Sequence, residues 1–233
     1  MILTVSGIRV AGICALIFAG CTAGKVAGSG DHARIVFFGD SITEQGAAPG
    51  GYVALVKEEF ARRGSTTEII GAGVSGNKVE QLQARIDKDV IAKKPTTVVI
   101  YIGINDVWHW TIGIAGAKGS TPAEFETGLR NVIAKIQAVG AKVILCTPSV
   151  IGEKKAGANA EDAKLEEYSA ISRRVAKETG STLCDLRKAF VDYIAEHNPG
   201  DQDRGILTTD RVHLNAAGNT FVAKEMVRVL DAH

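Results

Sequence analysis

Short apolar runs alternate with longer amphipathic stretches along most of the chain. The apolar runs lie at residues 34–38, 68–70, 97–102, 142–146 and 181–186, and each has the length of a strand. The run at 97–102 is apolar along its length, which is typical of a central strand in a parallel sheet. The pattern therefore predicts five strands.

The stretches between these runs repeat apolar residues every three or four positions, which predicts amphipathic helices. The clearest helix begins with Thr121, Pro122 and Glu124, a capping box with proline at the first helical position. Gly180 stands where a glycine ends a helix, and Asn215 stands where a side chain caps one. We expect helices over residues 52–63, 79–90, 122–139, 165–179, 190–195 and 216–230.

Strands that alternate with helices predict a parallel sheet that is covered on both faces. Right-handed crossovers then build an α/β fold, a three-layer α/β/α sandwich with a five-stranded parallel sheet. The 233 residues are enough for one such domain with its own core. No linker divides residues 31–233, so we expect one domain there.

The first 30 residues have a different composition. Residues 1–20 hold one basic residue, Arg9, and an apolar run that is shorter than a transmembrane helix and fits a secretory signal peptide. With Cys21 after small residues, this segment resembles a bacterial lipoprotein signal, although Phe18 stands where leucine is usual. The resemblance implies a lipid on Cys21, a flexible tether over 21–30 and a place on the periplasmic or cell-surface side of a bacterial membrane. Cleavage without lipidation and an uncleaved anchor are the alternatives.

Charge and cysteine content restrict the classes of partner. The formal net charge is +1, so no electrostatic argument favours a nucleic-acid partner. Cys14 and Cys21 belong to the leader, whereas Cys146 and Cys184 lie in strand-like runs. We interpret the latter two as buried free thiols, although an oxidising compartment would also permit a disulfide between them. No cysteine–histidine spacing indicates zinc, so we expect no metal.

Polar residues follow the predicted strands. The first strand ends in Gly-Asp-Ser at residues 39–41, a glycine-rich turn follows the second at 71–77, and Gly-Ile-Asn follows the third at 103–105. Ligand sites in such folds lie beyond the carboxyl ends of the strands. Near the C-terminus Asp210 and His213 are three residues apart, so one turn can bring the carboxylate to the imidazole. Each block alone has a simpler interpretation as turn chemistry, but together they favour a catalytic site.

In this order the four blocks resemble the SGNH (GDSL) hydrolase family over residues 34–231. The resemblance implies a five-stranded parallel sheet, in agreement with the strand count. It also implies that Ser41 is the nucleophile, that His213 is its general base and that Asp210 orients the base. The oxyanion hole would consist of the N–H groups of Ser41 and Gly76 and the side-chain amide of Asn105, and no cofactor is required. One position departs from the family, because Gly71 stands where block two often has asparagine, which leaves open how that loop is supported.

The substrate is less well defined by the sequence. Asp40, Trp108 and Trp110 flank the blocks and are candidate substrate contacts. The loops at 111–120 and 149–162 could border the site, and neither contains a long apolar stretch. We therefore expect a serine esterase for short acyl groups such as acetyl, with carbohydrate esters as one candidate substrate. The alternatives are a lysophospholipase or thioesterase for longer chains, an acyltransferase, and a non-catalytic carbohydrate-binding surface protein.

Overall fold

The computed structural model describes residues 1, 2, 33–113 and 115–233, and its strands form one parallel sheet. The strands are β1 (Arg34–Gly39), β2 (Glu68–Gly73), β3 (Thr97–Tyr101), β4 (Lys142–Cys146) and β5 (Thr182–Cys184). Their spatial order is β2-β1-β3-β4-β5, and every neighbouring pair is parallel. The chain adds β2 on one side of β1 and β3 on the other, so the order reverses between β1 and β3. Such a switch point is where α/β folds bind ligands.

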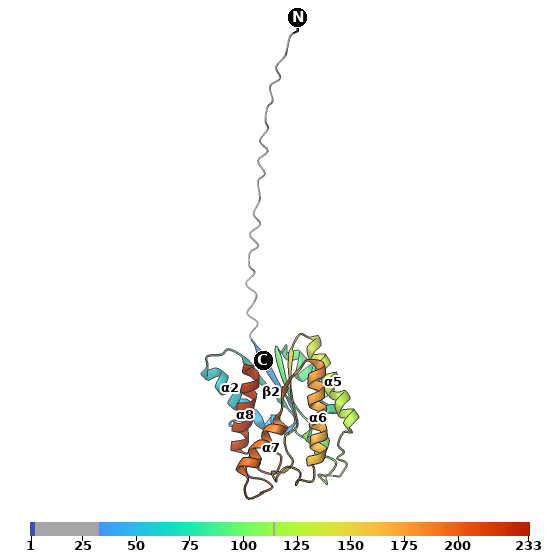
Figure 1. The fold of residues 1–233 in the computed structure, drawn as a ribbon, viewed down its shortest axis with the longest axis vertical. Helices are drawn as coiled ribbons and strands as arrows, with labels where there is room; N and C mark the ends of the chain where they lie inside the picture. The colour runs from blue at the N-terminus through green and yellow to red at the C-terminus, as the bar shows by residue number, and fades with distance from the viewer. Residues whose placement is uncertain (3–32, 114) are drawn as a thin grey trace. The chain divides into compact units, whose positions relative to one another are not determined.

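Helices cover both faces of this sheet (Figure 1). The helix pair α2 and α8 packs side by side, and α7 contacts α8 through Phe190 and Phe221. Helix α5 packs between α3 and α6 in a second layer. The bounds are α1 (Ser41–Gly46), α2 (Tyr52–Arg62), α3 (Val79–Asp89), η1 (Ile91–Lys93), α4 (Ile104–Trp108), α5 (Pro122–Ala138), α6 (Asp162–Thr179), α7 (Leu186–His197) and α8 (Ala216–Asp231). The described residues thus form the expected three-layer α/β/α sandwich.

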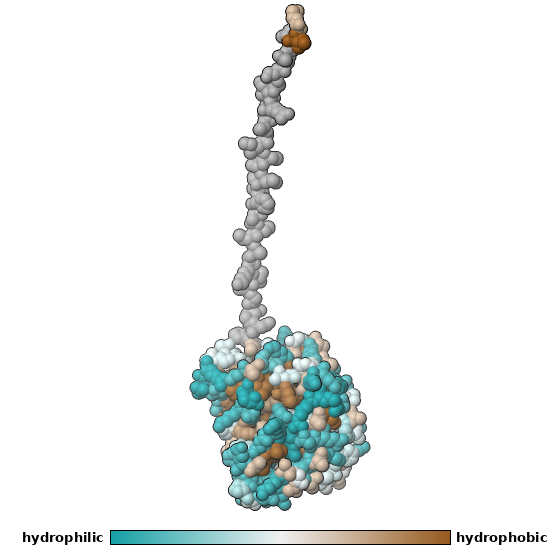
Figure 2. Space-filling view, viewed as in Figure 1, coloured by the Kyte–Doolittle hydropathy of each residue, from teal (hydrophilic) through white to brown (hydrophobic). Residues whose placement is uncertain are grey.

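The hydrophobic core lies on both sides of the central strands. All five residues of β3 are buried, as are Val36, Phe37 and Phe38 of β1. Helix α5 adds the predicted apolar stripe that includes Phe125 and Leu129, both fully buried. Each such side chain contributes roughly 1.5–3 kcal/mol when it is buried. The face seen in Figure 2 is mostly hydrophilic, with small separate apolar areas. This agrees with the burial of most large apolar side chains in the core.

Local signals set several helix ends as predicted. Thr121 and Glu124 form the capping box, in which each side chain accepts a hydrogen bond from the other residue's backbone N–H. Gly180 ends α6 in the left-handed conformation, with a φ of 68°. The side chain of Asn215 accepts the N–H of Gly218 at 2.8 Å and begins α8, the helix that follows the candidate catalytic turn.

Some boundaries differ from the prediction. β2 continues beyond residue 70 because it stays paired with β1 as far as Gly73. β5 has only three residues because Asp185 caps α7 by accepting the N–H of Lys188, and α7 therefore begins before the predicted helix at 190–195. The sequence pattern does not predict α1 and α4, whose six and five residues are too few to show a helical period.

Cys146 and Cys184 are buried free thiols, which was the favoured interpretation of the sequence. They lie opposite each other in the register of β4 and β5. Burial and the neighbouring Cys184 thiol raise the pKa of Cys146 well above its usual value. The Cys146 thiol is therefore protonated and unreactive near neutral pH.

The predictions for the N-terminal segment lie outside the described residues, apart from residues 1 and 2. This applies to the signal peptide, to the tether and to lipidation of Cys21, which stay predictions. Among the described residues, no helix has both the length and the apolar character needed to cross a bilayer.

Candidate active site

Three residues from distant parts of the sequence meet in one hydrogen-bonded line. Ser41 directly follows Asp40 at the end of β1, and its side chain is largely buried, with 8% of the residue exposed. Its Oγ lies 2.9 Å from Nε2 of His213, and Nδ1 of His213 lies 2.6 Å from Oδ2 of Asp210. A hydroxyl, an imidazole and a carboxylate in this order form a nucleophile with its general base and the group that orients the base.

The turn that carries Asp210 and His213 is shaped by its own backbone. Oδ1 of Asp210 accepts the N–H groups of Val212 at 3.1 Å and His213 at 2.8 Å, which leaves Oδ2 for the imidazole. Arg211 has a φ of 84°, which is uncommon for a residue other than glycine. Its carbonyl accepts the N–H of Gly152 at 2.8 Å. This left-handed residue lets a carboxylate and an imidazole three positions apart face each other outside a helix.

The carboxyl group of Asp210 is held in its ionised form. Partial burial raises the pKa of Asp210, but hydrogen bonds from the His213 ring and from two backbone N–H groups outweigh burial and lower the pKa below its usual value. An ionised carboxylate at Nδ1 keeps Nε2 of His213 free to accept a proton from Ser41. It also stabilises the imidazolium that forms when the proton is taken.

A second carboxylate, which the sequence does not signal, anchors the segment before the catalytic turn. Glu153 is fully buried, and its oxygens accept the N–H groups of Ile206 at 2.7 Å, Leu207 at 2.6 Å and Thr208 at 2.6 Å. Thr208 is then paired across the turn by an antiparallel bridge. The loop at 149–162 therefore packs against the catalytic turn as a support.

The three predicted oxyanion donors come from the ends of three adjacent strands. Ser41 is the first residue of α1, so its N–H is one of the helix's unpaired N-terminal donors. Gly76 has a φ of 76° and open space where a Cβ would be, so a ligand can approach its backbone closely. Asn105 is 5% exposed and donates one amide hydrogen to the carbonyl of Asn77 at 3.0 Å. A carboxamide has two N–H donors, so the second is left for an oxyanion.

Gly103 sets the position of Asn105 by turning the chain from β3 into α4. Its φ is 122°, and a Cβ there would lie 3.2 Å from both Phe125 and Pro148. Glycine meets the conformational and the steric demand together. The short helix that follows places Asn105 over the end of the sheet beside block two.

The departure from the family pattern at Gly71 has a steric reason. A Cβ at residue 71 would lie 2.7 Å from Cβ of Ala47, so no side chain fits between β2 and the end of α1. The block-two turn is held from α1 instead, since the carboxylate of Glu44 accepts the N–H of Ser75 at 2.8 Å as well as its hydroxyl. Support for the loop therefore comes from outside it.

Asp40, a candidate substrate contact in the sequence, is buried directly before the nucleophile. The residue is 2% exposed, and its carboxylate accepts the N–H of Ile42 at 3.0 Å. The side chain turns back to cap α1 and so fixes the first turn of the helix that presents Ser41. Burial, assisted by the nearby carboxyl of Asp106, raises the pKa of Asp40 to about 7.

The two tryptophans after block three lie in different surroundings. The half-buried Trp108 meets the His213 ring edge-on, with ring centroids 6.4 Å apart. Trp110 is 38% exposed, its indole N–H donates to the carbonyl of Ser120 at 3.2 Å, and two lysine ammonium groups lie over its ring. The structure thus places Trp108, and not Trp110, beside the catalytic histidine.

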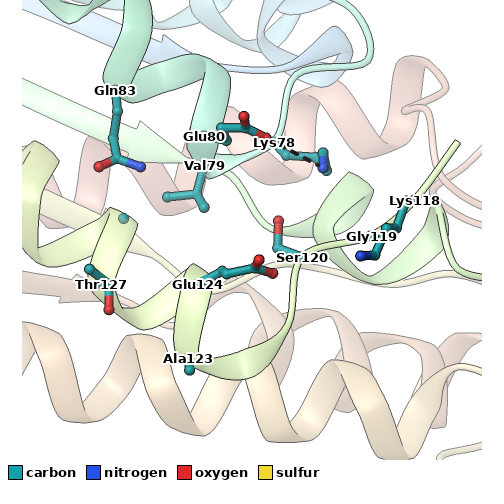
Figure 3. Close-up of a pocket in the computed structure, with 11 residues that line it drawn as sticks. Lys78, Val79, Glu80, Gln83, Lys118, Gly119, Ser120, Ala123, Glu124 and Thr127 are labelled. Atoms are coloured by element: carbon teal, nitrogen blue, oxygen red, sulfur yellow. Dashed lines mark ion pairs between the residues drawn. The ribbon is translucent and has the colours of Figure 1, made fainter.

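A pocket with several polar side chains in its lining lies next to the turn that carries Gly76 (Figure 3). Its volume is about 550 Å³, and it is enclosed by the starts of α3 and α5 and by residues 118–120. Lys78, two residues after Gly76, lines it, and Gln83 and Thr127 lie toward the end away from residue 118. The lining offers ammonium, carboxylate, amide and hydroxyl groups, and it includes none of the triad residues or predicted oxyanion donors.

This arrangement can carry out acyl transfer through a covalent intermediate. His213 takes the proton of Ser41 as Oγ attacks an ester carbonyl, and the three donors stabilise the oxyanion that forms. His213 then protonates the leaving alcohol, and water activated by the same imidazole hydrolyses the acyl-enzyme.

Known proteins share this chain's sequence and fold. The model of the GDSL-like Lipase/Acylhydrolase family matches residues 37–221. An acetylxylan esterase of Geobacillus stearothermophilus is 32% identical over 220 residues, which are 86% of this chain and 94% of that protein. Esterase TesA of Pseudomonas aeruginosa is 32% identical over 208 residues, 85% of this chain and 89% of its own. The crystal structure of the acetyl xylan esterase AlAXEase has a TM-score of 0.81 and 44% identity, and the match covers 84% of this chain and 99% of that one.

The family match includes the whole sheet beyond the first residues of β1 and every residue of the hydrogen-bonded line. Ser41, Gly76, Asn105, Asp210 and His213 all lie within residues 37–221. The chain therefore belongs to the GDSL-like Lipase/Acylhydrolase family and is a serine hydrolase that acts on ester bonds.

Proposed function

We propose that this protein removes acetyl groups from acetylated saccharides of the xylan type. The observation that carries the proposal is the Ser41–His213–Asp210 line in a chain that is 44% identical, over 84% of its length, to an acetyl xylan esterase. A second acetylxylan esterase is similar over 94% of its own length. Similarity over nearly the full length supports a shared substrate class and not only a shared fold.

The surroundings of the triad support a saccharide substrate. Trp108 lies beside His213, with ring centroids 6.4 Å apart, where its indole could pack against a sugar ring. The pocket beside Lys78 holds groups that match sugar hydroxyls, such as the hydroxyl of Thr127 and the amide of Gln83 (Figure 3).

The test compares esters on the purified protein. Acetate release from acetylated xylo-oligosaccharides is measured beside hydrolysis of 4-nitrophenyl acetate and 4-nitrophenyl palmitate, with Ser41→Ala as the control. The proposal expects acetate release from the saccharide and little activity on the palmitate. Faster hydrolysis of the palmitate than of the acetate would assign the protein to long-chain esters. Activity on 4-nitrophenyl acetate without acetate release from the oligosaccharide would refute the proposed saccharide substrate.

The role of the pocket can be tested separately with Thr127→Trp, which fills its far end. Loss of one sugar contact of about 1.4 kcal/mol lowers kcat/KM about tenfold. We expect that decrease on the acetylated oligosaccharide and no change on 4-nitrophenyl acetate, which is too small to reach the pocket. Equal kcat/KM for variant and parent on the oligosaccharide would exclude the pocket from binding.

For the location of the protein we propose export and a lipid anchor on Cys21. The support is the sequence pattern of residues 1–21, which resembles a bacterial lipoprotein signal. In a bacterial host fed radiolabelled palmitate, the protein should carry label in the membrane fraction, and Cys21→Ala should not. An unlabelled, soluble parent protein would refute the anchor.

A further inference from the structure

One guanidinium group connects the chain segments that supply all three oxyanion donors. Arg85 lies on α3, and its side chain is 15% exposed. Its Nη2 donates to the carbonyl of Gly39 at 2.6 Å, its Nη1 to the carbonyl of Ala72 at 2.9 Å, and its Nε to Oδ1 of Asn77 at 2.7 Å. A fourth contact is an ion pair within α3, in which Nη1 donates to the carboxylate of Asp89 at 2.9 Å.

The three acceptors other than Asp89 are each close in the chain to an oxyanion donor. Gly39 is the last residue of β1, two positions before Ser41. Ala72 belongs to β2, which leads into the turn that carries Gly76. The Arg85 guanidinium therefore fixes the ends of two neighbouring strands relative to each other, and with them the backbone N–H groups that follow.

The third acceptor links Arg85 to the side-chain donor. Asn77 presents Oδ1 to Arg85 and its main-chain carbonyl to Nδ2 of Asn105. Asn77 is buried, with 9% of its surface exposed, so its two contacts fix it firmly. A chain of two hydrogen bonds thus runs from Arg85 through Asn77 to the amide of Asn105.

The fork of the guanidinium suits this task. Its N–H groups point in fixed directions within one plane, so it can hold several acceptors at set angles, which a lysine ammonium cannot do. The plane is itself located, because the guanidinium carbon lies 4.5 Å from the centre of the Phe38 ring. Phe38 is fully buried in β1, so Arg85 rests on a rigid part of the core.

We propose that Arg85 is a positioning residue for the oxyanion hole. It acts on the N–H groups of Ser41 and Gly76 through the strand ends that precede them, and on the Asn105 amide through Asn77. Oxyanion stabilisation depends on donors that are already aimed at the developing charge, and a small misplacement removes much of the rate enhancement. This role also answers how the block-two loop is supported when residue 71 is glycine. The proposal rests on ester hydrolysis at Ser41, the chemistry of the proposed function, and is independent of which alcohol the ester contains.

The principal test measures kcat and KM on 4-nitrophenyl acetate for Arg85→Lys, with Asp89→Asn as the matched control. Asp89→Asn removes the ion pair from the same guanidinium but leaves its three contacts to Gly39, Ala72 and Asn77. We expect kcat to fall roughly 10- to 100-fold in Arg85→Lys, since the loss of one whole oxyanion donor costs about 10²–10³. KM should change less than threefold, and Asp89→Asn should keep the parent kcat.

Two further variants separate positioning from a general structural effect. Asn77→Ala leaves Arg85 and its contacts to Gly39 and Ala72 in place, so it should lower kcat more than twofold but less than Arg85→Lys does. The double variant Arg85→Lys/Asn77→Ala should be little worse than Arg85→Lys alone, because Arg85→Lys has already lost the contact that Asn77→Ala removes. Thermal unfolding of each protein shows which variants are folded at the assay temperature.

The outcomes distinguish this proposal from the proposed function. A parent protein without activity on any ester refutes the esterase function itself. An active parent with Arg85→Lys and Asn77→Ala within twofold of its kcat refutes the positioning role alone. A decrease confined to KM, or fully additive losses in the double variant, would also contradict it. Should Arg85→Lys fail to fold, the kcat of Asn77→Ala still decides.

Discussion

The sharpest prediction concerns Glu153, which holds the catalytic turn although it touches neither Asp210 nor His213. In Glu153→Gln the side chain keeps its shape but has one acceptor oxygen in place of two. The carboxylate now accepts two N–H groups at Oε1, from Leu207 and Thr208, and one at Oε2, from Ile206. An amide in its place must therefore direct its own N–H₂ group at one or two of these donors.

The magnitude follows from those three contacts. A hydrogen bond to a charged group contributes about 1.5–3 kcal/mol, and a buried donor left without an acceptor costs about 1–3 kcal/mol. The variant also avoids burying a charge, which offsets part of the loss. We expect Glu153→Gln to lower the free energy of unfolding by about 2–3 kcal/mol, which in a chain of this size lowers Tm by roughly 5–10 °C.

The assay pairs urea denaturation with kcat on 4-nitrophenyl acetate, measured well below the Tm of the variant. Because the turn is anchored less firmly, we expect kcat to fall roughly 10-fold while the protein is still folded. Glu167→Gln is the matched control, since Glu167 is exposed on α6 and the same change there should stay within about 0.5 kcal/mol. A Glu153→Gln protein with the stability and kcat of the parent would refute the reasoning.

Two further predictions follow from the buried polar groups. Asn105→Ala should lower kcat on 4-nitrophenyl acetate about 10²–10³-fold with little change in KM, as removal of one oxyanion donor does; an unchanged kcat would exclude the amide from the oxyanion hole. Asp40 has a folded-state pKa of about 7, above its ordinary value of 3.8. Its contribution to stability is therefore present below about pH 4 and lost as the pH rises toward 7. At about 1.4 kcal/mol per pKa unit, Asp40→Asn should gain up to about 4 kcal/mol relative to the parent between pH 4 and pH 8 in urea unfolding, and a difference that is constant with pH would contradict the assignment.

The sequence predicts the fold and the triad because their signals are local and repeated. Each strand is a compact apolar run, and Ser41 and Asn105 follow two of those runs directly. Asp210 and His213 are close enough in the chain for one turn to join them. The resemblance to a known family then assigns catalytic roles to these residues, which none of the four blocks would indicate by itself.

The supporting residues escape such analysis because they act on backbone groups of distant segments. Glu153 binds the N–H groups of residues 206–208, more than 50 positions away, and no periodicity marks it. Arg85 does leave a signal, since it is a charged residue between Leu82 and Ile86 on the buried face of α3. The capping role of Asp40 was not predicted either, because a sequence does not show whether a polar side chain after a strand points outward or back to cap a helix.

The most direct test of the account is the hydrolysis of 4-nitrophenyl acetate by the parent protein and by Ser41→Ala under identical conditions. The account predicts that the parent is active and that kcat falls by about 10⁴-fold or more in the variant, because the nucleophile is lost. A folded Ser41→Ala protein that hydrolyses the ester at the parent rate would show that Ser41 is not the nucleophile.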